Sequence, residues 1–128
     1  MPRLASSFGS IKDRYEIVVV GSGYGGAIAA SRLARAGREV CLLEQGKEFQ
    51  PGEYPNTLLE ATAELQVSMP DVDVHLGSRT GLYDLHAGHD INVFKGCGLG
   101  GTSLVNANVS IKPDPRVFTE YSWPAAIK

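Results

Sequence analysis

A glycine-rich segment at residues 21–26, with the sequence GSGYGG, constrains the fold of this chain more than any other feature. It follows a β-branched run at 15–20 that predicts a strand buried on both faces, and it opens an alanine-rich helical pattern that ends at Gly37. A second apolar run at 39–43 predicts another buried strand. Strand, tight turn, helix and strand form a βαβ unit with parallel strands, which predicts an α/β fold of the Rossmann type.

The spacing of these glycines suits a dinucleotide ligand. Gly21 allows a tight turn, Gly23 lets a diphosphate approach the backbone, and Gly26 lets the helix pack closely on the strand. The helix N-terminus offers free N–H groups to phosphates. Glu44, at the end of the second strand, is placed to accept from adenosine ribose hydroxyls and to repel a 2′-phosphate. The alternative is an ordinary turn with a solvated acid, and the order of strand, glycines, helix, strand and acid disfavours it.

A second glycine group contains Gly96, Gly98, Gly100 and Gly101. Glycines this dense imply that the backbone passes close to another group. A nicotinamide-binding domain with a single motif does not need such a segment. A flavin cofactor does, because its ribityl chain and ring system must be held beyond the diphosphate.

Three segments of the chain together resemble the glucose–methanol–choline (GMC) family of flavoprotein oxidoreductases, and most of all its cholesterol-oxidase-like branch. They are residues 17–30 (IVVVGSGYGGAIAA), 43–46 (LEQG) and 96–106 (GCGLGGTSLVN). The resemblance implies FAD, held non-covalently because Val105 stands where some members attach the flavin to a histidine. It also implies a Rossmann-like FAD-binding fold of the three-layer FAD/NAD(P)-binding type, here incomplete and with an added β-hairpin.

The resemblance places the cofactor site residue by residue. The diphosphate would lie at the first glycine group and the adenosine ribose at the end of the second strand. The ribityl chain and flavin would lie along the second glycine group and the segment after it, where Ala107 replaces a glycine common in cholesterol-oxidase-like members. The expected cofactor-binding residues are Gly21, Gly23, Tyr24, Gly25, Gly26, Glu44, Gln45, Gly46, Gly98, Gly100, Gly101, Ser103, Asn106, Ala107 and Val109.

The remaining sequence predicts further elements around this site. We expect an irregular segment at 1–14 and a partial FAD-binding domain at 15–128 that lacks the substrate domain and the catalytic C-terminal region. The elements expected downstream are a helix at 57–68 that begins with a capping box, a polar loop at 71–80, a hairpin of 82–86 with 90–95, a short strand at 109–111, and helix starts at Asp114 and Ser122.

Composition excludes several classes of function. The net charge of −2 argues against a nucleic-acid-binding protein. The two cysteines, Cys41 and Cys97, are expected to be free thiols in a reducing compartment. No apolar run is long enough for a membrane span and no signal peptide is seen, so a cytoplasmic location is expected. His86 and His89 are expected to be surface turn residues, and no metal site is predicted.

The expected function is that of the FAD-binding N-terminal portion of an oxidoreductase that oxidises an alcohol by hydride transfer to FAD. The catalytic histidine of the family lies far toward the C-terminus, so no catalytic residue is assigned and an alcohol or sterol substrate is expected only for the full-length parent. One alternative is a catalytically silent truncated polypeptide or a subunit that needs a complementing chain. Another is a nicotinamide-binding module. The sequence does not identify the substrate, the electron acceptor or the oligomeric state.

Overall fold

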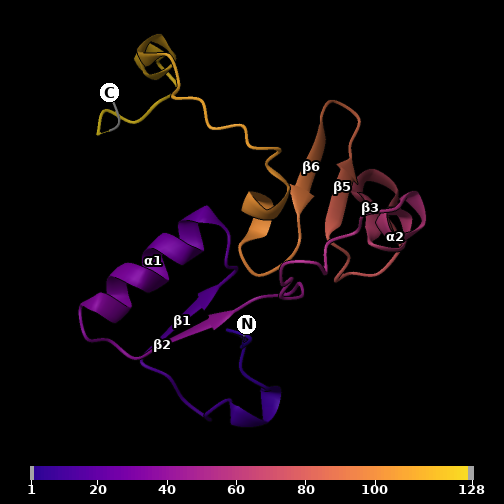
Figure 1. Cartoon of the computed structure of the whole chain (residues 1–128). Helices are drawn as coiled ribbons and strands as arrows, with labels where there is room; N and C mark the ends of the chain where they lie inside the picture. Colours follow the sequence, from indigo (N-terminus) through magenta and orange to yellow (C-terminus); the bar gives the residue numbers. More distant parts are fainter. Residues whose placement is uncertain (1, 127–128) are drawn as a thin grey trace.

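The computed structural model describes residues 2–126 and begins with a short 3-10 turn, η1 (Phe8–Ser10), followed by a βαβ unit (Figure 1). This unit consists of β1 (Ile17–Val20), α1 (Tyr24–Arg35) and β2 (Val40–Leu43). The two strands pair in parallel, with Ile17 opposite Val40 and Val20 opposite Leu43. The Rossmann-type unit predicted from the sequence is therefore confirmed.

A four-stranded mixed sheet forms the second part of the chain. Its strands are ordered β4-β3-β5-β6, with β3 and β5 parallel and the outer pairs antiparallel. The short helix α2 precedes β3, and η3 connects β6 to the C-terminal segment (Figure 1). The elements are α2 (Leu58–Ala63), β3 (Leu65–Met69), η2 (Pro70–Val72), β4 (Val74–Leu76), β5 (Tyr83–Ala87), β6 (Asn92–Gly96), η3 (Gly101–Val105) and η4 (Pro115–Thr119).

The predicted helix at 57–68 is wrong in its second half. The capping box at its start is present, with the Thr57 side chain and Glu60 exchanging hydrogen bonds with each other's backbone. The helix ends at Ala63 because residues 65–69 pair as a strand with both β4 and β5. The predicted polar loop at 71–80 is also wrong in part, since it contains β4.

The predicted hairpin is confirmed as β5 and β6, with Asp84 opposite Lys95. The strand expected at 109–111 does not form, because these residues pair with no strand in the described part of the chain, and they follow a turn in which Ala107 and Asn108 have φ angles of 51° and 59°. Asp114 caps η4 as predicted, by accepting from the N–H of Arg116. Residues 121–126 form turns rather than the helix expected from Ser122, and residues 127–128 of the expected domain lie outside the described part.

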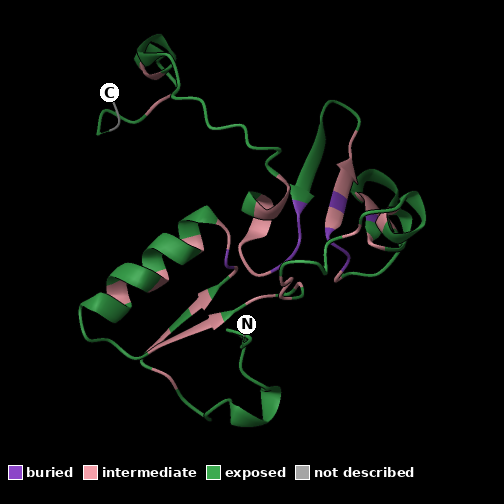
Figure 2. Ribbon diagram, viewed as in Figure 1, coloured by how far each residue is buried: buried purple, intermediate pink, exposed green. Residues whose placement is uncertain are grey.

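Burial is concentrated where the two parts of the chain meet. Leu82 and Cys97 are buried at the bases of β5 and β6, and the Cys97 N–H donates to the Leu82 carbonyl at 2.8 Å (Figure 2). The strand β1, in contrast, is not buried on both faces as predicted: Val18 and Val20 are 52% and 82% exposed. That expectation fails because no element within residues 2–126 covers this side of β1.

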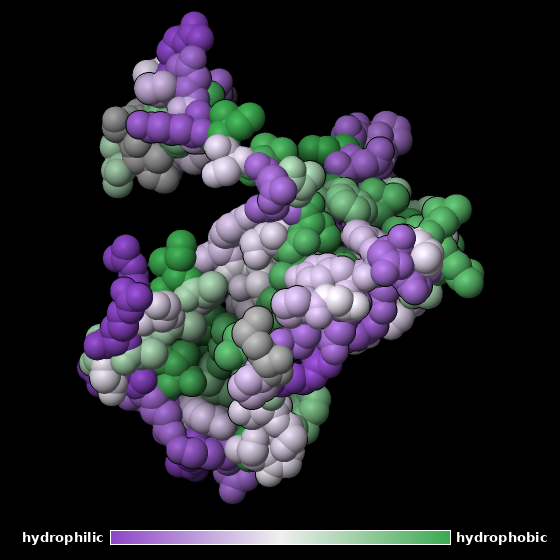
Figure 3. Space-filling view, in the orientation of Figure 1, coloured by the Kyte–Doolittle hydropathy of each residue, from purple (hydrophilic) through white to green (hydrophobic). Residues whose placement is uncertain are grey.

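The four-stranded sheet turns a polar face inward and an apolar face outward. Gln66 and Asp84, opposite one another on β3 and β5, are 2% and 6% exposed. On the other face, Leu76 and Phe94 are more than half exposed. Hydrophobic side chains are visible over this part of the molecule in Figure 3. The polar face belongs to the site described below.

Candidate functional site

The first glycine group forms a tight turn between β1 and α1. Gly21 has a φ of 89°, in the left-handed region that favours glycine, and its N–H donates to the Leu43 carbonyl at 2.7 Å. A Cβ atom added at Gly26 would lie 1.9 Å from the Gly21 carbonyl oxygen. The absence of a side chain at Gly26 therefore lets α1 pack directly against the end of β1.

The N-terminus of α1 is open. Gly23 is its N-cap residue and supplies no side-chain cap. A Cβ atom added at Gly23 or Gly25 would meet no protein atom within 4 Å. The first N–H groups of an α-helix have no partners within the helix, so this end can donate to an anionic ligand.

The two glycine groups, far apart in the sequence, come together at this point. A Cβ atom added at Gly101 would lie 2.7 Å from the Cα of Gly23. The Gly100 N–H donates to the Ser22 hydroxyl oxygen at 2.8 Å. The second glycine group is therefore required for the close approach of two backbone segments.

Glu44 fixes the first glycine group to the end of β2. Its Oε2 atom accepts from the N–H and the hydroxyl of Ser22, at 2.8 and 2.6 Å, and its Oε1 atom accepts from the Gly46 N–H at 2.9 Å. Burial alone would raise the pKa of Glu44, but hydrogen bonds from Gly46 and Ser22 outweigh it and hold the pKa below its usual value. A carboxylate has about four acceptor positions, and these three hydrogen bonds occupy most of them.

These segments line an open cavity of about 240 Å³. One side is the backbone of the two glycine groups, and another is the end of β2. The polar face of the hairpin supplies a third side. The lining residues are Gly23, Glu44, Gln45, Asp84, Lys95, Gly96, Cys97, Gly101 and Thr102.

Comparison with known proteins identifies relatives of this chain. Residues 19–52 match a family model described as an NAD(P)-binding Rossmann-like domain. The chain is 30% identical over 113 residues to a cholesterol oxidase of Mycobacterium tuberculosis (strain ATCC 25618 / H37Rv), an alignment that covers 88% of the chain and 18% of that protein. It is 35% identical over 116 residues to a long-chain-alcohol oxidase of Arabidopsis thaliana, with 88% and 14% covered.

A GMC-type oxidoreductase of Mycobacterium tuberculosis (strain CDC 1551 / Oshkosh) is 35% identical over 102 residues, with 78% of the chain and 14% of that protein covered. The chain is homologous to the N-terminal portion of the GMC-type oxidoreductases. It spans 14% to 18% of the length of these curated relatives. The resemblance found in the sequence is thereby confirmed.

The structure brings some of the expected GMC-type cofactor residues to the cavity and leaves others away from it. Gly23, Glu44, Gln45 and Gly101 line the cavity. Asn106, Ala107 and Val109 follow η3, are exposed, and are not among the lining residues. The other expected residues build the turn and loops behind the cavity: Gly21, Tyr24, Gly25, Gly26, Gly46, Gly98, Gly100 and Ser103.

The absence of a side chain at Gly46 is required by the packing of the chain itself. A Cβ atom added there would lie 2.3 Å from the Gly98 nitrogen. The neighbouring Lys47 forms an isolated bridge with Gly98, and its carbonyl accepts from the Leu99 N–H at 2.9 Å. Gly46 thus lets the segment after β2 lie directly against the second glycine group.

Sequence reasoning missed five lining residues: Asp84, Lys95, Gly96, Cys97 and Thr102. The alternation of polar and apolar residues in the hairpin gave a signal, since Asp84 and His86 share one face, but it did not show which face meets the glycine groups. Cys97 is a free thiol, as is Cys41. Burial, reinforced by the charge of Glu44, raises the pKa of the Cys97 thiol, which favours an unreactive packing role.

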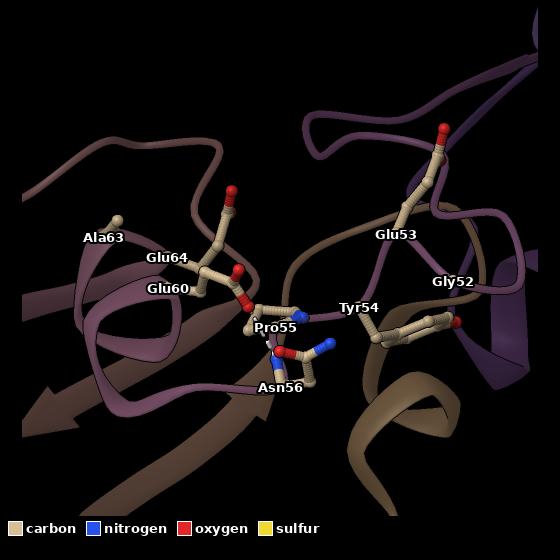
Figure 4. Close-up of a pocket in the computed structure, with 8 residues that line it drawn as sticks. All are labelled: Gly52, Glu53, Tyr54, Pro55, Asn56, Glu60, Ala63 and Glu64. Atoms are coloured by element: carbon tan, nitrogen blue, oxygen red, sulfur yellow. Dashed lines mark hydrogen bonds between the residues drawn. The ribbon is translucent and has the colours of Figure 1, made fainter.

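A second hollow, of about 230 Å³, lies beside α2 and is lined in part by Glu53, Glu60 and Glu64 (Figure 4). Each of these carboxylates already serves the fold. Glu53 binds Arg3 and Glu60 belongs to the capping box. Glu64 contacts the Lys47 ammonium and accepts from the Leu82 N–H. This hollow is therefore the weaker candidate for a functional site.

Neither a metal site nor a membrane-spanning helix is found within residues 2–126. Over that range, no group of three or more His, Cys, Asp or Glu side chains is arranged to hold a metal ion. His86 and His89 instead lie beside Asp84 and Asp90, respectively. None of the helices in the described range has the length and apolar character needed to cross a bilayer.

Proposed function

We propose that this chain binds FAD non-covalently in the cavity between its two glycine groups, as the dinucleotide-binding region of an oxidoreductase that acts on alcohols. The observation that carries the proposal is the approach of Gly101 to Gly23 beside the open N-terminus of α1. A single glycine turn would suit many nucleotides. Two glycine segments facing one cavity suit a ligand whose groups extend beyond the diphosphate.

Each part of FAD has a proposed position. The diphosphate lies at Gly23, where the N–H groups and dipole of α1 favour negative charge. The adenosine ribose lies at Glu44, directly after β2. The ribityl chain follows the second glycine group, and the flavin reaches beyond the cavity to the exposed segment after η3, where the backbone amides of Asn106 and Ala107 face its edge. When bound, FAD supplies an acceptor for hydride, and such amides stabilise negative charge on the reduced ring.

The choice of FAD over a nicotinamide cofactor rests on the second glycine group. The family model that matches residues 19–52 is described by NAD(P) binding, and it ends well before Gly96. The Glu44 carboxylate disfavours a cofactor with a 2′-phosphate, because the two negative charges repel. NAD is therefore the comparison ligand in the test.

Oxidation of an alcohol is proposed for the larger protein to which such a region contributes. The relatives are named as oxidases of cholesterol and of long-chain alcohols, and both substrates carry a hydroxyl group. The chain spans 14% to 18% of their length, so the catalytic acid–base groups and the substrate pocket are not assigned to residues of this chain.

The test is FAD binding by the purified 128-residue chain, measured by quenching of flavin fluorescence, with NAD as comparison. We expect saturable FAD binding, and its loss in Gly23→Val. The backbone of Gly23 is extended, with φ −62° and ψ −176°, and the added Cβ meets no protein atom within 4 Å, so the variant should fold. Valine there instead occupies the space proposed for the diphosphate.

Gly9→Val is the matched control, because Gly9 is also open on its Cβ side and lies in η1, away from the cavity. Circular dichroism establishes that both variants retain the wild-type fold. Unchanged FAD affinity in Gly23→Val would contradict the diphosphate position. Binding of NAD in preference to FAD by the wild-type chain would contradict the proposed cofactor.

A further inference from the structure

We propose that Lys95, oriented by the buried Asp84, is the cationic side chain that contacts the diphosphate of the bound dinucleotide. This inference rests on the proposed function and adds to it a residue that neither glycine group contains. It concerns the hairpin, which the sequence did not connect to the cofactor.

The hairpin register places Lys95 beside the cavity. Asp84 on β5 lies between Gln66 on β3 and Lys95 on β6, in one row across the sheet. Both Asp84 and Lys95 line the same cavity as Gly23 and Gly101. Strand pairing therefore brings this charged pair to the cavity that the two glycine groups also line.

The ammonium of Lys95 is held in place but keeps its donors. Its Nζ atom lies 3.2 Å from Asp84 Oδ2, and the Lys95 side chain is 45% exposed. This contact is an ion pair on one side of the ammonium, and the exposed remainder of the side chain can reach a ligand. Asp84 is itself fixed, because its side chain is only 9% exposed and its Oδ1 atom lies 3.1 Å from His86 Nε2.

Two buried polar atoms of this cluster face each other. Asp84 Oδ1 and His86 Nε2 are both buried and lie 3.1 Å apart, without a hydrogen bond of regular geometry between them. A buried carboxylate without full compensation is costly unless charge is supplied nearby. The Lys95 ammonium, 3.2 Å from Asp84 Oδ2, supplies such a charge at the edge of the cavity.

The charge balance of the cavity requires a cation. Its charged lining residues are Glu44, Asp84 and Lys95, so two carboxylates face one ammonium. A diphosphate entering beside Gly23 adds further negative charge. The helix N-terminus contributes only about half of a positive charge, and Lys95 is the one cationic side chain among the lining residues that can reduce the repulsion of the diphosphate.

The test compares ligands with and without phosphate on the full chain. ADP and adenosine share the base and ribose, and only ADP carries the diphosphate. We expect Lys95→Gln to weaken ADP and FAD binding by roughly tenfold to a hundredfold, the effect of losing one charged hydrogen bond, and to leave adenosine affinity unchanged. Lys95→Arg should retain most of the wild-type ADP affinity, and the salt dependence of ADP binding should be shallower in Lys95→Gln.

Lys47→Gln is the matched control. Lys47 is 47% exposed, close to the value for Lys95, and pairs with the carboxylate of Glu64, but it does not line the cavity. The Lys47→Gln substitution removes the same charge from the chain as Lys95→Gln. Equal losses of ADP affinity in the two variants would therefore indicate a general electrostatic effect and overturn the inference.

The outcomes separate the two proposals. If the wild-type chain binds neither FAD nor ADP, the proposed function fails and the inference fails with it. If the wild-type chain binds both and Lys95→Gln binds ADP as tightly, the inference alone fails. Equal losses for ADP and adenosine in Lys95→Gln would show that Lys95 only supports the sheet, and would also overturn it.

Discussion

At the scale of single residues, Glu44 has a structural role besides the ligand contact that its position in the sequence predicts. Its position after β2 predicts a ribose contact, whereas the structure shows that both carboxylate oxygens first bind the chain itself, at Ser22 and Gly46. The same carboxylate therefore shapes the turn that approaches the ligand.

The lowered pKa of Glu44 predicts how stability depends on pH. A glutamate in an unfolded chain has a pKa of about 4.3, and that of Glu44 lies lower in the folded chain. Its stabilising contribution is present above the unfolded value and is lost as the pH falls through the folded value. We expect Glu44→Gln to lower the melting temperature at pH 7. Between about pH 5 and 3, the melting temperature of this variant should fall less than that of the wild-type chain.

Thermal unfolding followed by circular dichroism checks this expectation. Glu48, Glu53, Glu60 and Asp114 also have lowered pKa values, so both proteins should lose stability in acid. The informative quantity is the difference between the two melting curves as a function of pH. A difference that stays constant down to pH 3 would contradict the role given to the Glu44 charge.

At the scale of elements, the contact between α1 and β1 is the feature that the sequence predicted best. The glycine spacing indicated which residue faces the strand, because a turn and a helix have fixed geometry. The strands β3 and β4 were missed because their pairing depends on partners far along the chain. A short apolar stretch such as 65–69 is compatible with either helix or strand until its neighbours are known.

Two adjacent glycines in α1 provide a matched test of this contact. Gly26→Ala should destabilise the chain by about 1–3 kcal/mol, the usual range for overpacking, because its Cβ would lie 1.9 Å from the Gly21 carbonyl oxygen. Gly25→Ala should instead stabilise it by about 0.5–1 kcal/mol, since its Cβ meets no atom within 4 Å and alanine favours helix. Urea denaturation measures both, and equal effects would contradict the packing described here.

The candidate site was predictable only where it is local in sequence. The turn at Gly21–Gly26 and the acid at Glu44 follow from motif and spacing. Asp84 and Lys95 do not, because only the register of the hairpin shows that they share a row and face the glycine groups. The segment with Ala107 differs again: its positive φ of 51° explains why a glycine would suit this position.

At the scale of the whole molecule, two parts are joined by a small set of contacts around the cavity. Ser22 receives a hydrogen bond from Gly100, and the Gln45 side chain donates to the Arg79 carbonyl at 2.5 Å. Few side chains are fully buried there. A ligand that contacts both glycine groups would therefore contribute much of the cohesion between the βαβ unit and the mixed sheet.

Ligand-dependent protection tests this cohesion. At an FAD concentration of 100 times the dissociation constant, the free energy of unfolding should rise by about 2.7 kcal/mol. Amide hydrogen exchange should slow at the start of α1 and at Gly98–Gly101 together, and remain unchanged at 115–119 in η4. Protection confined to the βαβ unit would show that the ligand does not bridge the two parts.

The inward polar face of the mixed sheet has a consequence for how this chain can vary. Side chains of a strand alternate between faces, so shifting the hairpin by one residue would bring Tyr83 or Leu85 to the place that Asp84 now occupies. Insertions and deletions of single residues within β5 should therefore be poorly tolerated, even though many side chains on the outer face are exposed. Substitutions on that outer face should be far easier to accept, because they leave the length and register of the strand intact.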